Sequence, residues 1–470
     1  MAAGGTELQR DDVQGFVVSG YGKMGHATFA MLSVTDGDGA RRWLADLAPR
    51  VTNAVRSAER RCVNVAFTSA GLRALGMADA DVRTFSVPFQ EGMAVPHRSR
   101  ALGDDGASEP SRWEWGARDD ENLHVLLLLY AVDADELDDL VAEELGLERL
   151  EGALRLIRRL DPERLPGRLN VGKFGVEHFG VADGMSQPVV AGSGQEAKLA
   201  GDDARRTVID TGEFVLGYPN GYAKLTPVPK AGTGTPRAWE FGRNGTYLVF
   251  RHLYQDVAAF WQYVDGVTGG DEEARVKLAA KFVGRWPSGA PLVRSPHRDD
   301  PDLGADNSFG YAEWDPHGFR CPVGSHIRRT NPRDFGDAKP ARNLELSNLH
   351  RIVRRGRVYG PELDDPLGGD DGVDRGLFFI CLNANIERQF EFVQHHWSNN
   401  TKFRGLYDEA DPVSGAQPEE GGAFTVQAMP VRRRYDGVAN FVIVRGGAYF
   451  FLPGIEALRR LASGEATAGR

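Results

Sequence analysis

Cysteine is scarce in this chain of 470 residues, which contains only Cys62, Cys321 and Cys381. So few thiols exclude a disulfide-rich scaffold and are typical of a reducing compartment, where cysteines pack as small apolar side chains. Residues 1–14 are polar and acidic, and they lack the basic and apolar regions of a secretion signal. We therefore expect a cytoplasmic protein.

An excess of positive charge is also missing, because 66 acidic residues outnumber 56 basic ones and leave a net charge of −10. Such a chain has neither a long-range attraction to phosphate backbones nor the polybasic block that anionic lipids bind. The longest apolar run lies around residues 125–129, far short of the roughly 20 residues that cross a bilayer. Nucleic acids and membranes are therefore not expected partners.

The motifs that hold a catalytic or structural zinc ion are absent as well. The sequence contains no HExxH motif and no paired CxxC motifs. His395 and His396 are adjacent, and adjacent side chains on a helix point about 100° apart, so the two are not expected to share a metal ion.

The length of the chain indicates two domains, because it exceeds the roughly 250 residues at which a single hydrophobic core stops growing. Hydrophobic residues at 41% and charged residues at 26% are ordinary values for a folded protein. Residues 189–240 are rich in glycine, proline and polar residues and show weak periodicity, as a connection between domains does. We place the two domains at residues 1–225 and 226–470.

Strand and helix patterns alternate in the same way in both halves. In the first half, we expect strands at residues 26–33, 62–68 and 124–132 and helices at residues 41–51 and 135–145. In the second half, we expect strands at residues 246–251, 377–382, 440–444 and 449–452 and helices at residues 256–264, 386–397 and 455–461. This repeated alternation predicts an α+β fold of two antiparallel sheets with helices packed on one face.

One candidate catalytic segment contains Asp183, which lies between Gly180 and Gly184 and is followed by Pro188. This composition is typical of a loop. Two interpretations stay open for Asp183. It caps the local backbone in an Asx turn, or it acts as a general acid and base at the loop tip.

Two further segments are basic. His326 precedes Arg333 by seven residues, and Arg354 belongs to a run of arginines before Gly360. Taken singly, a lone histidine is usually a satisfied polar side chain, and a basic run is usually a solvated face. Only the three segments together favour a functional site.

Together and in this order, the segments resemble the dye-decolourising peroxidase family. The family's GxxDG motif is met at residues 180–184, its histidine followed by Ile-Arg and by Asn-Pro-Arg at residues 326–333, and its arginine before a Tyr-Gly at residues 354–360. Further matching stretches are residues 14–22, 244–261, 376–385 and 446–453. The likeness extends from about residue 13 to residue 462. It implies two ferredoxin-like domains, with haem bound in the C-terminal half.

The resemblance implies one haem b per chain, bound without thioether links because no CxxCH motif occurs. It makes His326 the proximal iron ligand, a role that imidazole commonly has in peroxidases. A ligating histidine normally donates its other N–H group to an acceptor, which in this family is an acid near a Gln-Phe-x-Phe stretch. Glu391 is the candidate here and Glu387 the second choice, although a solvated glutamate on a helix is an equally good interpretation.

On the distal side of the haem, the resemblance places Asp183 and Arg354. Asp183 would move a proton from one peroxide oxygen to the other, and Arg354 would stabilise the negative charge on the leaving oxygen. Because the reference pKa of an aspartate is about 3.9, we expect activity to favour acidic pH.

Three more residues complete the predicted haem pocket. Arg333 is the candidate contact for a haem carboxylate, with a structural ion pair as the alternative. Leu377 and Phe379 alternate on one strand and therefore share one face. By resemblance they form the roof of the distal pocket, whereas the sequence alone makes them core residues.

The implied function is that of an enzyme that uses hydrogen peroxide to oxidise dyes and phenols, with Mn(II) as a further candidate donor. Surface tryptophans or tyrosines would relay electrons from bulky donors. One alternative is a non-enzymatic haem carrier or sensor on the same scaffold. Another is the chlorite or coprohaem chemistry of related α+β barrels. The oligomeric state, monomer or homo-oligomer, stays open.

Overall fold

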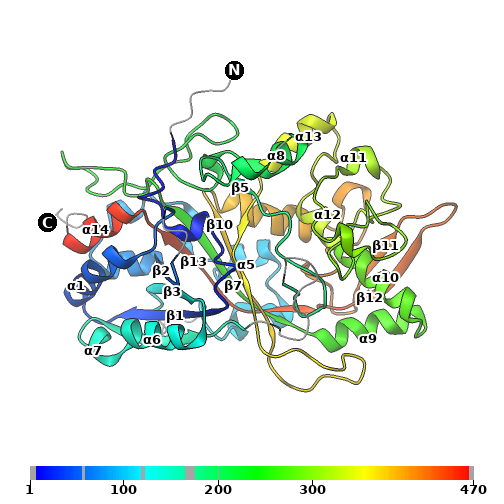
Figure 1. The fold of residues 1–470 in the computed structure, drawn as a ribbon, viewed down its shortest axis with the longest axis horizontal. Helices are drawn as coiled ribbons and strands as arrows, with labels where there is room; N and C mark the ends of the chain where they lie inside the picture. Colours follow the sequence, from blue (N-terminus) through cyan, green and yellow to red (C-terminus); the bar gives the residue numbers. More distant parts are fainter. Residues whose placement is uncertain are drawn as a thin grey trace.

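The computed structural model describes residues 7–55, 59–117, 122–163, 165, 175–199 and 201–464. Its main feature is a nine-stranded sheet that runs through both halves of the chain (Figure 1). The strands follow the order β4-β1-β3-β2-β13-β7-β10-β8, all neighbours are antiparallel, and β9 pairs with β10. The strands of this sheet are β1 (His26–Val34), β2 (Arg61–Phe67), β3 (Val125–Ala131), β4 (Leu154–Leu160), β7 (Thr246–Gln255), β8 (Val353–Arg354), β9 (Arg357–Tyr359), β10 (Gly376–Asn383) and β13 (Val442–Leu452).

The N-terminal half of the sheet has a ferredoxin-like topology. Helix α1 (Gly37–Leu47) connects β1 to β2, and helix α6 (Ala134–Leu145) connects β3 to β4. Both helices begin at an aspartate cap: Asp36 accepts the N–H of Gly39 at 2.6 Å, and Asp133 accepts the N–H of Glu136 at 2.9 Å. Apolar residues then recur on one side of each helix and pack against the sheet.

The C-terminal half repeats this strand order with β13, β7, β10 and β8. Helix α9 (Val257–Thr268) follows β7, and two π-helical segments, η9 (Glu387–Glu391) and η10 (Val393–Ser398), follow β10. The predicted α+β fold with two ferredoxin-like units is confirmed. The domain boundary between residues 225 and 226 stays a prediction.

The structure also corrects several expectations. The two predicted sheets are one sheet, because β13 pairs with β2 at Phe451 and Phe67. The strands predicted at residues 440–444 and 449–452 are the single strand β13, whose register shifts between Val444 and Gly446. The helix predicted at residues 386–397 is π-helical rather than α-helical. Strand β4 was not predicted, because only the two ends of its sequence are buried and no alternation is visible.

The two faces of the sheet contribute to different cores. On one face, apolar side chains of β1, β2 and β3 pack against α1, α6 and α14 (Ile455–Ser463). The other face packs against the segment around Phe16 and Tyr21, and its two halves pack against each other, with Phe29 of β1 on Phe250 of β7 and Phe378 of β10. In the C-terminal half, the first of these faces borders a cavity.

The remaining elements are short or lie at the edges of the molecule. Two small sheets are formed by β5 (Val189–Val190) with β6 (Val208–Ile209) and by β11 (Gly422–Val426) with β12 (Arg433–Val438). The other α-helices are α2 (Ser69–Ala74), α3 (Asp79–Val82), α4 (Val87–Glu91), α5 (Pro96–Leu102), α7 (Leu147–Leu150), α8 (Gly201–Thr207), α10 (Glu272–Val283), α11 (Tyr311–Trp314), α12 (His326–Thr330) and α13 (Pro340–Asn348). Among the described residues, no helix has the length and apolar character that a membrane span requires.

Candidate active site

A cavity of about 820 Å³ lies against the C-terminal half of the sheet. Its walls include side chains of β7, β10 and β13, the start of α12, and the loop around Asp183. Six residues that were predicted from sequence line this one cavity: Asp183, His326, Arg333, Arg354, Leu377 and Phe379. Glu391 is not among the lining residues.

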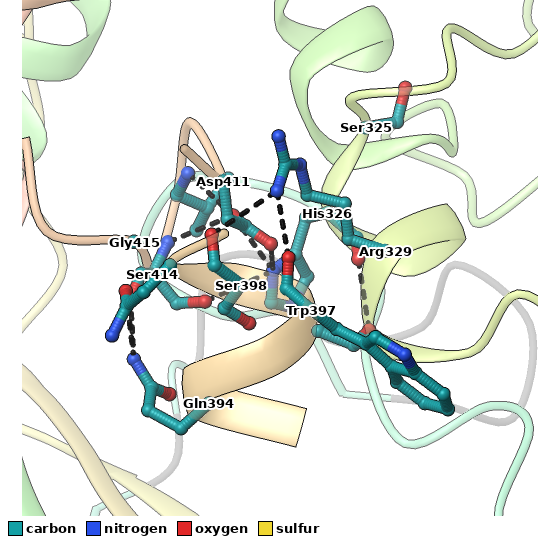
Figure 2. Close-up of polar contacts among 12 residues, drawn as sticks. Ser325, His326, Arg329, Gln394, Trp397, Ser398, Asp411, Ser414 and Gly415 are labelled. Carbon is teal, nitrogen blue, oxygen red and sulfur yellow. Dashed lines mark hydrogen bonds and ion pairs between the residues drawn. The ribbon is translucent and has the colours of Figure 1, made fainter. Parts of the chain in front are cut away.

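His326 is the first residue of α12, and its ring is fixed from one side (Figure 2). Nδ1 lies 2.9 Å from Oδ2 and 3.2 Å from Oδ1 of Asp411, so this N–H donates to the carboxylate. Ser414 Oγ lies 3.4 Å from the same nitrogen. Within the described residues, each hydrogen bond of the ring uses Nδ1. Nε2 is therefore the nitrogen that is left to ligate a metal ion from the cavity.

Asp411 is fully buried and held by its own loop. Its Oδ1 accepts the N–H groups of Val413 at 2.9 Å and Ser414 at 3.0 Å. Burial alone would lower the pKa of His326 and raise the pKa of Asp411, but the attraction between the two groups outweighs it. The net result is a raised pKa for His326 and a lowered pKa for Asp411. Asp411 is therefore stabilised as a carboxylate, which accepts the Nδ1–H of His326.

Arg329, on the same short helix, organises the surroundings of this pair (Figure 2). Its guanidinium is fully buried and donates to the carbonyl oxygens of Trp397 at 2.7 Å and Asn400 at 3.1 Å, and also to that of Glu409. It thus joins the end of η10 to the loop that leads to Asp411.

The expectation that Glu391 accepts the hydrogen bond of His326 is wrong. Both carboxylate oxygens of Glu391 lie 2.9 Å from Nη1 of Arg98, and Tyr449 donates its hydroxyl at 2.8 Å. The second choice, Glu387, is exposed and lies 3.7 Å from the same guanidinium. The physical reason is the π-helical turn, which is wider than an α-helical turn and changes the direction in which each residue points. Asp411 was missed because a single acid in a loop has no distinguishing spacing.

Asp183 and Arg354 face each other across the cavity wall. Oδ1 of Asp183 lies 3.7 Å from Nη2 of Arg354. The same Nη2 donates to the carbonyl of Met185 at 2.9 Å, and the backbone N–H of Arg354 donates to Gln187 Oε1 at 3.1 Å. Strand β8 and the Asp183 loop therefore hold each other in place. The Asp183 carboxylate pairs with a cation, in contrast to the Asx turn that was the alternative interpretation.

Buried arginines form a second wall of the cavity. Arg333 donates to the carbonyls of Asn307 and Phe309, both at 2.9 Å, and Arg351 donates to the carbonyl of Ser186 at 2.6 Å. Burial lowers the pKa of Arg351 to about 9, and the nearby Arg333 and Arg354 add to this shift. Among the described residues, neither Arg333 nor Arg351 forms an ion pair, so the alternative of a structural ion pair for Arg333 finds no support. This wall carries positive charge that an anionic ligand would compensate.

Leu377 and Phe379 form an apolar part of the wall. Both belong to β10, and the register pairs them with Leu253 and Arg251 of β7, which also line the cavity. The cavity thus combines an available imidazole nitrogen, an apolar face and cationic side chains. These features fit a haem, which needs an axial ligand, an apolar environment for its ring and cationic partners for its carboxylates.

Comparisons with known proteins point to one family. A family model described as the DyP dimeric alpha+beta barrel domain matches residues 12–147. The chain is 31% identical to the dye-decolorizing peroxidase msp1 of Mycetinis scorodonius, over 98% of this chain and 89% of that protein. It is 30% identical to the multifunctional dye peroxidase DyP2 of Amycolatopsis sp., over 85% of this chain and 83% of that protein.

Solved structures agree with the sequence comparisons. A fungal DyP-type peroxidase from Auricularia auricula-judae has a TM-score of 0.79 at 26% identity, covering 97% of this chain and 100% of the other. A dye-decolorizing peroxidase in complex with 2,6-dimethoxyphenol has a TM-score of 0.77 at 27% identity, with the same coverage. The chain therefore belongs to the dye-decolourising peroxidases, haem enzymes that are oxidoreductases with a peroxide as the electron acceptor.

Proposed function

We propose that this chain binds one non-covalent haem b through Nε2 of His326 and uses hydrogen peroxide to oxidise dyes and phenols. The observation that carries the proposal is the shared cavity. His326, Asp183 and Arg354 all line this cavity, and Asp411 accepts a hydrogen bond from Nδ1 of the His326 ring. A ligand, a proton carrier and a cation are the three groups that peroxide chemistry needs from the protein.

Bound haem supplies the redox-active iron that transfers electrons from the donor to peroxide. The protein contributes proton transfer and charge. A carboxylate oxygen of Asp183 takes the proton from one peroxide oxygen and delivers it to the other oxygen, which leaves as water. Arg354 is held by Met185 and Gln187, so its fixed charge stabilises the negative charge on the leaving oxygen.

The other predicted residues contribute to binding and to size selection. Arg333 and its neighbour Arg351 would hold the haem carboxylates, because their charges have no carboxylate partner among the described residues. Leu377 and Phe379 would limit the distal space to small molecules such as peroxide. Large dyes would then give up electrons at the protein surface, which stays a prediction.

Mn(II) as an electron donor also stays a prediction. In the part of the chain that the structure describes, no group of three or more histidine, cysteine, aspartate or glutamate side chains is placed to hold a metal ion.

The test is a pair of substitutions that spare the proximal side, Asp183→Asn and Arg354→Leu. We expect both variants to retain haem but to lose at least 100-fold in the rate constant for the reaction with peroxide, measured by stopped-flow absorption. Asp138→Asn, on the exposed face of α6, is the matched control and should react at the wild-type rate. Wild-type rates in both distal variants would instead favour a haem carrier or sensor, which needs His326 but neither distal group.

A further inference from the structure

The loop that carries Asp183 is built around a second carboxylate, that of Glu177. Glu177 lines the same cavity as Asp183 and precedes it by six residues. Nothing in the proposed chemistry uses this side chain. Its contacts, however, are all directed at the loop and at the neighbouring strand.

Three donors converge on the Glu177 carboxylate. The backbone N–H of Phe179 donates to Oε2 at 2.9 Å, and that of Val181 donates to Oε1 at 3.0 Å. The side-chain amide of Gln255, the last residue of β7, donates to Oε2 at 2.8 Å. The carboxylate therefore fills the inside of the turn and ties it to the sheet.

The backbone of the turn closes around this carboxylate. The N–H of Glu177 donates to the carbonyl of Val181 at 3.1 Å, and the N–H of Gly180 donates to the carbonyl of Glu177 at 2.8 Å. At the far end, the N–H of Asp183 donates to the carbonyl of Gly175 at 2.9 Å. The position of Asp183 therefore depends on the shape of a turn whose interior is occupied by Glu177.

A carboxylate is the side chain that this environment requires. All three neighbours are N–H donors, and an ionised carboxylate offers acceptors only, whereas an amide would turn an –NH2 group toward at least one donor. Among the described residues, no ion pair involves Glu177. Burial raises the pKa of Glu177, the three hydrogen bonds oppose this shift, and the nearby Asp183 adds to it. Glu177 is half-buried where it lines the cavity, and N–H donors rather than a cation surround its charge.

We propose that Glu177 is a positioning residue for Asp183: with Gln255 it fixes the turn of residues 175–183, so that the Asp183 carboxylate stays within reach of Arg354 and of peroxide. This inference rests on the proposed role of Asp183. It adds a requirement that the GxxDG motif alone does not contain, because the fixing groups lie upstream of the motif and on another strand.

The test uses Glu177→Gln in the haem-loaded protein. The side-chain –NH2 group of the new glutamine would then face an N–H donor, and the turn would shift to separate the two donors. A displacement of about 1 Å at a reacting group can cost on the order of 100-fold in rate. We expect the rate constant for peroxide to fall by about 10- to 100-fold, while haem content and the rate constant for donor oxidation stay at wild-type values. Amide hydrogen exchange at Phe179 and Val181 should become faster. Glu148→Gln, exposed on α7, is the matched control.

If Glu177→Gln does not fold, Glu177→Asp decides. This variant keeps the acceptor oxygens but retracts them by one methylene group, and a reduced peroxide rate constant with full haem content would support the proposal.

Parallel measurement of Asp183→Asn separates the two hypotheses. A wild-type peroxide rate in the Glu177 variants together with a slow Asp183→Asn would overturn the positioning role and leave the proposed function intact. A wild-type rate in Asp183→Asn as well would overturn the proposed function, and the positioning role with it.

Discussion

The same face of one sheet has two different surroundings in the two halves of the molecule. In the N-terminal half, Leu127 and Leu129 of β3 lie in an apolar core under α1 and α6. In the C-terminal half, Arg251 and Leu253 of β7 border the cavity. Figure 1 shows α1 and α6 beside the first strands, whereas α9 and α10 lie at the opposite end of the molecule. The site thus occupies the space that the helices of a ferredoxin-like unit would otherwise cover.

The helices of the C-terminal half explain why this space remains. Helices α9 and α10 contribute Phe260 and Phe282 to an apolar cluster of their own, together with Phe424 and Phe441. The segment after β10 is π-helical and directs Glu391 toward Arg98 of α5. A repeated topology therefore gains a ligand site when its helices pack on each other instead of on the sheet.

The largest expected effect concerns an ion pair on the open face, by which we mean the part of the sheet that borders the cavity. There, Arg251 and Asp104 are each 4% exposed and form an ion pair, whereas the closed face, the part covered by α1 and α6, is apolar. Arg251→Leu leaves the Asp104 carboxylate buried without a partner and should lower the free energy of unfolding by about 3–5 kcal/mol. Urea denaturation measures this change. The double variant Arg251→Leu with Asp104→Leu should recover most of the loss, and a double variant as unstable as the single one would contradict the explanation.

The next prediction compares a leucine-to-alanine substitution in the N-terminal half of the sheet with one in the C-terminal half. Leu129→Ala removes a fully buried side chain from the closed core and should cost about 2–5 kcal/mol of unfolding free energy. Leu253→Ala, at the half-buried cavity wall, should cost only about 1 kcal/mol in protein freed of haem. Equal losses in urea denaturation would mean that the open face is as tightly packed as the closed one.

A smaller effect tests which acid supports the proximal histidine. Asp411→Ala should weaken haem binding or peroxidase activity by about 10- to 100-fold, because partners of metal ligands orient the ligand and tune it. Glu391→Ala should leave haem affinity unchanged, since that carboxylate pairs with Arg98 and Tyr449. Haem titration followed by absorption would decide between them, and the opposite ranking would restore Glu391 as the acceptor.

The last prediction concerns pH and the far face of β7, where His252 is 3% exposed. Burial, with the nearby Arg445 and Arg158, lowers the pKa of His252 from 6.5 to about 3. Below pH 6.5 the His252 side chain therefore binds a proton in the unfolded chain but stays neutral in the folded protein. The contribution of this histidine to the free energy of unfolding is complete above pH 6.5 and is lost as the pH falls toward 3, by about 1.4 kcal/mol per pH unit.

His252→Gln provides the comparison, because glutamine can still accept the N–H of Trp115, which lies 3.3 Å from Nδ1 of His252. Urea midpoints at pH 7 and pH 5 should differ less in this variant than in the wild type. An identical pH dependence in both proteins would assign the acid sensitivity to other groups.

The sequence predicted the elements that have a clear period. Strands β1 and β3 and helix α6 appear within a few residues of their expected bounds. The continuity of the sheet was not predictable, because the pairing of β13 with β2 at Phe451 and Phe67 has no local signature. Strand β13 was divided in two because Gly446 and Gly447 interrupt its apolar pattern at the register shift.

The site was predictable where residues belong to motifs and not where they act from loops. His326, Asp183 and Arg354 were found by motif order, and all three line the cavity. Asp411 was not found, because its role comes from a loop that tertiary contacts of Arg329 and Ser398 bring to the histidine. Glu391 was chosen for its place in the Gln-Phe-x-Phe stretch, but it lies in a π-helical turn and pairs with Arg98 instead.

Helix α14 has a consequence for how the polypeptide reaches this fold. Leu458 and Leu461 belong to the same apolar core as Trp43 and Leu44 of α1, more than 400 residues earlier in the chain. During translation, the first ferredoxin-like unit leaves the ribosome long before α14 is synthesised. Its core can be completed only after nearly the whole chain has emerged, so the N-terminal unit must wait with part of its apolar surface uncovered until the final helix arrives.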